Sequence, residues 1–177
     1  MRILKWALGL LAVLVLVFVA GGMMLPREVT VARTTQIDAP ADQVFPHVNN
    51  LQATEAWSPW LGRDPKTKIT YGEIPEGVGA TMAWASENPQ VGVGNMEIVA
   101  SVPNEMVISD LDFGEMGLAK ATYDLTEVEG RTTITWGLQA DMGAGPVGRW
   151  MGLMMDRWVG ADYEQGLSNL KALVESS

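Results

Sequence analysis

The sequence contains no cysteine among its 177 residues. Disulfide frameworks, thiolate nucleophiles and zinc sites built on cysteine are therefore excluded, and the fold must be stabilised by its core alone. There is also only one histidine, His47, so it has no second histidine or cysteine as a co-ligand. We expect His47 to be exposed or simply hydrogen-bonded, and we expect neither a metal nor a cofactor.

Basic residues are scarce. The chain has 12 Lys and Arg against 21 Asp and Glu, which gives a formal net charge of −9. Such a surface repels phosphate backbones and excludes nucleic acid as an expected partner. No cluster of Lys or Arg is present that would hold the chain flat on an anionic leaflet, so any membrane contact must come from burial of apolar surface.

Sequence motifs for catalysis and nucleotide binding are missing as well. Gly92-Val93-Gly94 lacks the third glycine of a dinucleotide loop and is followed by a strand pattern, so we expect a hairpin turn there. The alternate carboxylates Asp110 and Asp112, with Glu115, do not have the spacing of a calcium loop and are typical of a solvated face. No phosphate loop, serine elbow or zinc-protease helix occurs.

One long apolar stretch stands out at the N-terminus, where no charged residue occurs from Trp6 to Leu25. At about 1.5 Å per residue a helix of this length reaches about 30 Å, the thickness of a hydrocarbon core. Arg2 and Lys5 precede the stretch, so the N-terminus should be cytoplasmic and the rest of the chain periplasmic or extracellular. We predict a transmembrane anchor over residues 1–26 and one domain over residues 27–177.

A cleaved signal peptide is the alternative for this segment. The small residues Ala20, Gly21 and Gly22 follow the apolar stretch and are compatible with a cleavage site. The stretch is longer than a usual signal core, which favours an uncleaved anchor. Both interpretations stay open at the level of sequence.

After Pro26 the hydrophobic pattern changes to that of a mixed domain. Alternation from Val29 to Ile37 predicts a strand, and Asp38-Ala39-Pro40 predicts the start of a helix that Pro46 divides into two short helices. A long helix is predicted from Val147 to Val174 by its helical periodicity. Six strands are predicted between these helices: Lys68 to Tyr71, Ala80 to Ser86, Asn95 to Val102, Glu105 to Phe113, Leu118 to Val128 and Thr132 to Asp141.

This order of elements resembles a known superfamily. Together with the segments Ile37-Asp38-Ala39-Pro40-Ala41-Asp42-Gln43-Val44-Phe45 and Trp57-Ser58-Pro59-Trp60, it is similar to the START-like (SRPBCC) superfamily, in its polyketide cyclase/dehydrase and lipid transport branch. The resemblance implies an α+β helix-grip fold: a curved antiparallel sheet wrapped around a long C-terminal helix, with two short helices after the first strand. It also implies an internal apolar cavity for a hydrophobic small molecule, and it carries no catalytic residue across.

We predict that the cavity is lined mainly by Met and Trp, because these side chains adapt to a variable hydrophobic guest. The competing interpretation is that the same apolar stripes simply fill the core. A third interpretation places Trp57 and Trp60 at a bilayer surface. The predicted cavity residues are Met82, Trp84, Met96, Ile98, Tyr123, Ile134, Trp136, Trp150, Met151, Met154, Met155 and Trp158.

The leading functional hypothesis is therefore a membrane-anchored, non-catalytic domain that binds or transports a lipid-like molecule. One alternative is a cyclase- or dehydratase-like enzyme, in which Tyr71, Tyr123, Arg149 or Arg157 would orient a ligand. The other is an envelope protein whose surface binds a protein partner, which the sequence does not identify.

Overall fold

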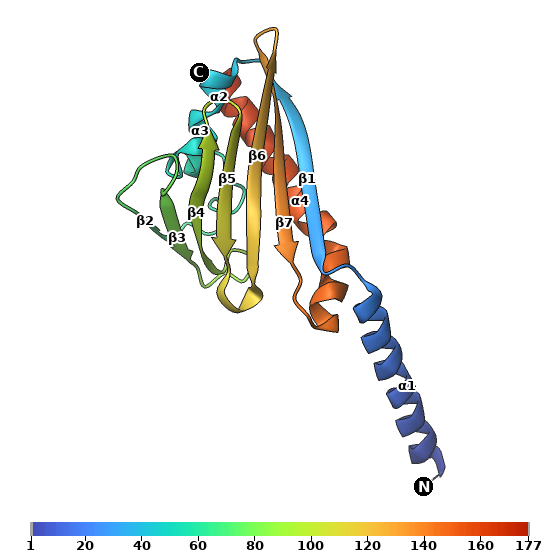
Figure 1. Cartoon of the computed structure of the whole chain (residues 1–177). Coiled ribbons are helices and arrows are strands. Elements are labelled where there is room, and N and C mark those ends of the chain that lie inside the picture. The colour runs from blue at the N-terminus through green and yellow to red at the C-terminus, as the bar shows by residue number, and fades with distance from the viewer. Residues whose placement is uncertain (1, 177) are drawn as a thin grey trace.

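The computed structural model describes residues 2–176, and the α+β class predicted from sequence is confirmed (Figure 1). Residues 1 and 177, which end the two predicted segments, lie outside the described residues. The helices are α1 (Arg2–Met24), α2 (Ala41–Val44), α3 (Pro46–Asn49), the 3-10 turns η1 (Ala53–Ala56) and η2 (Gly114–Met116), and α4 (Pro146–Glu175). The strands are β1 (Glu28–Ile37), β2 (Lys68–Tyr71), β3 (Thr81–Ala85), β4 (Val93–Val102), β5 (Met106–Asp112), β6 (Leu118–Val128) and β7 (Arg131–Asp141).

The strands form one antiparallel sheet in the order β1-β7-β6-β5-β4-β3-β2. The first strand thus pairs with the last, while β2 to β7 follow one another as a meander. Glu28 pairs with Asp141 at the end of the sheet next to α1, and we call this the anchor end. The β6–β7 turn lies at the opposite, far end of the sheet (Figure 1).

The break predicted at Pro46 is present. The helix that starts at Ala41 ends at Val44, and α3 starts again at Pro46, because proline has no N–H to donate to the preceding turn. The two short helices pack Val44 and Val48 into the core at the far end of the sheet. They close this end of the space between sheet and α4 (Figure 1).

The long helix α4 runs along β1 and crosses the sheet on one face, as the helix-grip fold requires (Figure 1). Pro146 begins it and provides a residue that needs no N–H donor in the first turn. Its buried side chains in the second half, Tyr163, Leu167, Leu170 and Val174, recur at helical spacing and join the main core. In the first half the buried positions are the glycines Gly152 and Gly160 instead.

Candidate functional site

The centre of the domain is a cluster of aromatic rings around Trp136. Trp136 is 3% exposed and lies between Tyr163, whose ring centroid is 3.8 Å away, and Tyr123, at 5.3 Å, with both rings stacked on the indole. Trp57 and Trp60 contact the same indole edge-on, at 5.2 and 5.6 Å. Aromatic rings thus fill the middle of the space between sheet and helix.

On the anchor-end side of this cluster, burial of the inner sheet face decreases from one row of residues to the next. Strand register aligns Val31, Leu138, Ala121, Ser109 and Ile98 in one row, and all of them are buried.

The neighbouring row, nearer the anchor end, runs from the buried Met82 to the buried Ala140, and its three middle residues are only half-buried: Met96, Leu111 and Ala119. We call them the open row. Beside it, Trp84 contacts Phe113 edge-on at a centroid distance of 5.9 Å, and both rings are also half-buried. The apolar interior is therefore least covered at the end of the sheet where α1 joins the domain.

Glycines bring the first half of α4 close to the sheet. A side chain at Gly148 would meet the Met142 carbonyl oxygen at 2.0 Å, and one at Gly152 would meet Val29 at 2.9 Å. At Gly160 the close neighbour is the Arg33 guanidinium, at 2.1 Å. Because these glycines occupy the sheet-facing positions, the large apolar residues of this half of α4 lie on its sides and outer surface.

The structure places the predicted cavity residues in three groups. Met82, Ile98, Tyr123, Ile134 and Trp136 are buried in the core. Trp84, Met96 and Met155 are partly buried and packed against it. Exposed on α4 are Trp150, Met151, Met154 and Trp158.

The core and the half-buried groups are thus brought together, and the exposed group on α4 lies apart from them. The assignment of these twelve residues to one ligand cavity stays a prediction.

The third interpretation, with Trp57 and Trp60 at a bilayer surface, is wrong for this structure. Trp57 is only 2% exposed, and its Nε1 donates to the His47 carbonyl oxygen at 3.0 Å. Trp60 Nε1 donates to Asp162 Oδ2 at 2.9 Å. Both tryptophan side chains point into the aromatic cluster. Pro59, which lies between them in the sequence, contacts Gly166 of α4.

The polar groups near the cluster do not form an acid–base pair. Burial raises the pKa of Tyr123, and the pKa of Tyr163 is raised by burial and by the neighbouring Tyr123, so both hydroxyls stay protonated. The Trp136 Nε1 is buried with no hydrogen-bond partner among the described residues. The hydroxyls of Tyr123 and Tyr163 and the indole N–H of Trp136 can each donate a hydrogen bond to an oxygen atom of a guest. None of these three groups can act as a base near neutral pH.

The remaining sequence candidates include His47, whose backbone carbonyl accepts from Trp57 of the cluster, and Tyr71, which is packed against the core. Partial burial lowers the pKa of His47, which sits in α3. Tyr71 donates its hydroxyl to Glu55 Oε1, so its pKa is raised by burial and by this hydrogen bond. Among the described residues no group of three His, Cys, Asp or Glu is arranged to hold a metal ion, and the side chain of Glu115 lies outside the described part.

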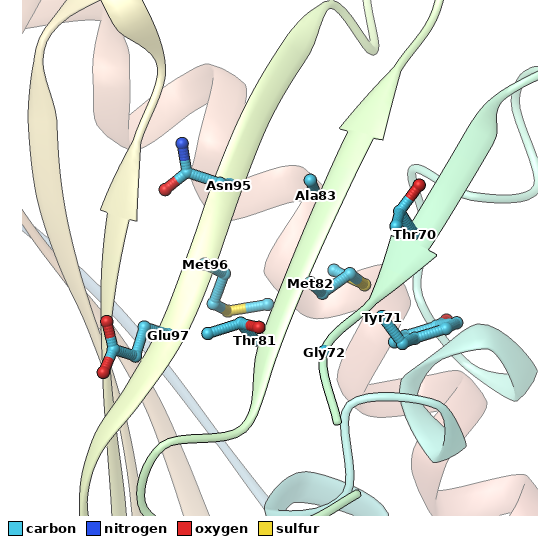
Figure 2. A pocket seen from close by; sticks show the side chains of 9 residues that line it. All are labelled: Thr70, Tyr71, Gly72, Thr81, Met82, Ala83, Asn95, Met96 and Glu97. Carbon is cyan, nitrogen blue, oxygen red and sulfur yellow. The ribbon is translucent and has the colours of Figure 1, made fainter. Parts of the chain in front are cut away.

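A depression of about 390 Å³ crosses β2, β3 and β4 (Figure 2). Its register row Thr70, Ala83 and Asn95 is exposed and has the opposite parity to the buried Met82. Figure 2 shows Asn95 pointing to one side of β4 and Met96 to the other. The exposed row of the depression therefore lies on the outer face of the sheet, while Met82 and Met96, which also line it, have the inward parity of the open row.

The end of α1 is packed against the start of α4. The Trp150 indole stacks on Phe18 at a centroid distance of 5.8 Å, and its Nε1 donates to the Phe18 carbonyl oxygen at 2.9 Å. Arg149 Nη1 donates to the carbonyl oxygens of Met23 and Leu25, at 2.8 and 3.2 Å. These bonds satisfy carbonyl groups at the C-terminal end of α1, which have no partner within the helix.

Comparison with known protein families agrees with this sheet, terminal helix and aromatic interior. Residues 28–175 match the family model described as polyketide cyclase / dehydrase and lipid transport. The chain belongs to this family. No curated protein matches the chain.

Solved structures of this family's fold are similar in shape at low sequence identity. Protein CV1439 from Chromobacterium violaceum is 18% identical with a TM-score of 0.59, over 82% of this chain and 97% of that one. Protein MLL2253 from Mesorhizobium loti is 18% identical with a TM-score of 0.60, over 84% and 98%. The di-domain ARO/CYC StfQ from the steffimycin biosynthetic pathway is 12% identical with a TM-score of 0.63, over 84% of this chain and 51% of StfQ. At these identities the likeness shows the fold alone.

Sequence reasoning missed several residues of the polyketide cyclase-like interior. Tyr163, Trp57 and Trp60 complete the aromatic cluster, and Leu111 and Ala119 complete the open row. The alternation of Leu111 with Asp110 and Asp112 was a usable signal for an inward position. For Tyr163 the signal was its helical spacing from the apolar residues Leu167 and Leu170.

Proposed function

We propose that the domain binds a hydrophobic or amphiphilic small molecule on the inner face of its sheet, while α1 tethers it to a membrane. The observation that carries the proposal is the open row. Met96, Leu111 and Ala119 are inward-facing and apolar, yet they remain half-exposed next to a fully buried row. A guest that covers them removes apolar surface from water, which favours binding at about 25 cal/mol per Å².

The surrounding residues suit a guest of variable shape. Met96, together with the partly buried Met142 and Met155, offers flexible thioether chains, and Trp84 offers a large flat ring. Deeper inside, the unpaired Trp136 Nε1 and the protonated Tyr123 hydroxyl are donors for an oxygen atom of the guest. The Asp162 carboxylate beside the cluster accepts from Trp60 and from Arg63, so it is held in an ion pair, which favours binding over catalysis.

The test is native mass spectrometry of the full chain, released from a membrane preparation in mild detergent. We expect a discrete added mass that organic solvent extracts. An empty chain that also refuses apolar dyes would contradict the proposal and would favour a protein-binding role for the fold.

Variants on one strand localise the site. Met96→Ala should reduce the occupancy of the guest several-fold, because it removes apolar contact from the open row. Val99→Ala is the matched control, since Val99 lies on the same strand and is 37% exposed beside the bulge between Ile98 and Ala100. Equal occupancy in the two variants would place the guest elsewhere.

The membrane tether is the second part of the proposal. Over the described residues one helix, Ile3–Met24, is long and apolar enough to cross a membrane, and a signal sequence has the same properties. Retention of the helix is supported by its packing, since cleavage after Gly22 would remove Phe18 from Trp150 and the Met23 carbonyl from its helix. The basic residues Arg2 and Lys5 at the N-terminal end of the chain, before the uncharged stretch from Trp6, favour a cytoplasmic N-terminus.

Intact mass and fractionation check the tether. We expect a mature chain that contains residues 1–25 and stays in the membrane pellet after alkaline carbonate washing. Protease added to the non-cytoplasmic side should digest the domain and leave a fragment of α1. A mature chain that starts near Met23 and appears in the soluble fraction would establish the signal-peptide interpretation instead.

A further inference from the structure

We infer that the first half of α4 lies in the headgroup region of a bilayer, so that the domain docks on the same membrane that α1 crosses. The contact surface consists of exposed apolar residues on the outside of this helix, and we call it the α4 outer surface. The inference rests on the proposed tether. The α4 outer surface is formed by Val147, Trp150, Met151, Leu153, Met154 and Trp158.

Depth along α1 is the first argument. A helix from Ile3 to Phe18 reaches only about 24 Å at about 1.5 Å per residue, less than the about 30 Å of a hydrocarbon core. If α1 spans the membrane, Phe18 therefore lies inside the apolar region or at its border. Trp150 stacks on Phe18 and donates to its carbonyl oxygen, so Trp150 lies at the same depth.

The depth agrees with that of an interfacial helix. From Phe18 to the end of α1 at Met24 is a distance of about 9 Å along the helix. Interfacial amphipathic helices bury their apolar faces by about 5–10 Å. The contact between Phe18 and Trp150 thus requires the start of α4 to enter the interface, independently of the composition of α4.

Composition is the second argument. Trp150 and Trp158 are 37% and 48% exposed, and indole rings favour the level of the headgroups. Arg157 is exposed, lies between them along the helix and makes no ion pair with any described residue. Its long side chain can reach a lipid phosphate while its methylene groups stay beside the apolar surface.

A second segment lies at the same end of the molecule. The β5–β6 turn is at the anchor end of the sheet (Figure 1), and it exposes Met116 by 72% and Leu118 by 64%. The open row begins directly behind this turn, since Leu118 pairs with Asp112 and Ala119 with Leu111. A docked domain therefore presents its least covered interior to the bilayer, which is the source of an apolar guest.

The bilayer is favoured over a second copy of the chain as the occupant of this surface. The α4 outer surface continues directly into the apolar surface of α1 through the stack of Trp150 on Phe18, so one membrane covers both. The net charge of −9 argues for docking by apolar burial rather than by attraction to anionic lipid. We therefore expect docking on neutral phosphatidylcholine and little effect of salt.

The experiment uses the full chain in phosphatidylcholine vesicles. Because the sequence has no cysteine, a single cysteine can carry a nitroxide label at one chosen site. Met154→Cys reports on the α4 outer surface, Val13→Cys on the middle of α1, and Val128→Cys, 64% exposed at the far end, on the aqueous side. The depth of the label in the membrane follows from the ratio of its collision rate with oxygen to its collision rate with a water-soluble nickel complex.

We expect the ratio of oxygen to nickel collisions to be highest at Val13→Cys, several-fold above the aqueous value at Met154→Cys, and aqueous at Val128→Cys. The ratio at Trp158→Cys should also lie above the aqueous value, as at Met154→Cys. The ratios should be unchanged when the salt concentration is raised to about 0.5 M, because ions screen charge interactions and do not screen apolar burial.

The outcomes separate the two proposals. An aqueous ratio at Val13→Cys would overturn the tether and, with it, the docking. A membrane ratio at Val13→Cys with an aqueous ratio at both α4 sites would overturn the docking and leave the tether intact. Protection of Met154→Cys from both reagents, with spin coupling between copies, would assign the surface to a second copy of the chain and overturn the docking as well.

Discussion

At the scale of single residues, Trp136 is the side chain on which the interior depends most. It contacts four other aromatic rings and is almost completely buried, so its removal leaves a large cavity in the centre of the domain. We expect Trp136→Ala to lower the free energy of unfolding by about 3–5 kcal/mol. Urea unfolding in detergent measures it.

Trp136→Phe is the matched variant for this prediction. Phenylalanine keeps a stacked ring between Tyr123 and Tyr163 and removes the unpaired Nε1 donor, so we expect a clearly smaller loss of stability than with alanine. Equal losses for the two variants would show that the indole itself, and not the aromatic stack, stabilises the centre.

Asp141 gives a prediction for acid pH. Arg27 donates to both of its carboxylate oxygens, and this lowers the pKa of Asp141 to about 2. A pKa that is depressed in the folded state contributes stability above the ordinary aspartate pKa, and the contribution is lost as the pH falls through the folded value. The Tm difference between the wild-type chain and Asp141→Asn should therefore be constant near pH 7 and shrink between about pH 4 and pH 2.

Thermal unfolding followed by circular dichroism at several pH values measures this difference. Both side chains of the pair are largely exposed, so the effect at pH 7 should be small. A Tm difference that stays constant down to pH 2 would show that the ion pair of Arg27, just before β1, with Asp141 of β7 adds nothing to folding.

At the scale of elements, the close contact between α4 and the end of β7 depends on Gly148. A methyl group there would lie 2.0 Å from the Met142 carbonyl oxygen, and backbone cannot move aside as a flexible side chain can. Overpacking of this kind costs about 1–3 kcal/mol and outweighs the helix propensity of about 1 kcal/mol that alanine gains over glycine. We expect Gly148→Ala to destabilise the domain in urea unfolding.

Gly145→Ala is the control for that variant. Gly145 is the N-cap of the same helix, and a methyl group there meets no atom within 4 Å. The loss of stability in Gly145→Ala should be smaller than in Gly148→Ala, about 0.5–1 kcal/mol, because it reflects only the poorer N-cap that alanine makes. If both variants are equally stable, the start of α4 is free to move away from β7.

The sequence predicted the elements well because their signals are local. The strand of Leu118 to Val128 was predicted with its observed bounds, and Pro46 divides the short helices as expected. The side of α4 that faces the sheet was harder to predict. Its first half carries large apolar residues on nearly every side, so periodicity alone does not separate the core from the outside.

The glycines were the overlooked signal on α4. Gly148 and Gly152 are four residues apart, and small residues at this spacing mark the face that approaches another element closely. The exposed position of Met151 and Met154 follows from that face. The aromatic cluster was not predictable in the same way, because the contact of Trp57 with Trp136 depends on how a loop crosses the sheet.

At the scale of the whole molecule, α1 and the domain form one packed unit rather than two parts joined by a linker. Between the end of α1 and the start of β1 only a few residues intervene, and Arg149 and Trp150 of α4 bond to the last two turns of α1. The orientation of α1 against the domain therefore depends on the rotational phase of a single helix. A change of that phase should therefore lower the stability of the domain.

Two insertions of equal composition test this coupling. Two leucines inserted between Val19 and Ala20 rotate Phe18 by about 200° relative to the domain and separate it from Trp150. The same leucines inserted between Gly9 and Leu10 lengthen α1 equally but leave every contact with α4 in place, because the structure brings no side-chain neighbour near Gly9. We expect the first insertion to lower the Tm of the domain in micelles and the second to leave it unchanged. Since both chains keep the same length and hydropathy, an equal Tm would mean that α1 and the domain fold and move independently, and that the orientation of the open row toward the bilayer is not fixed by the anchor.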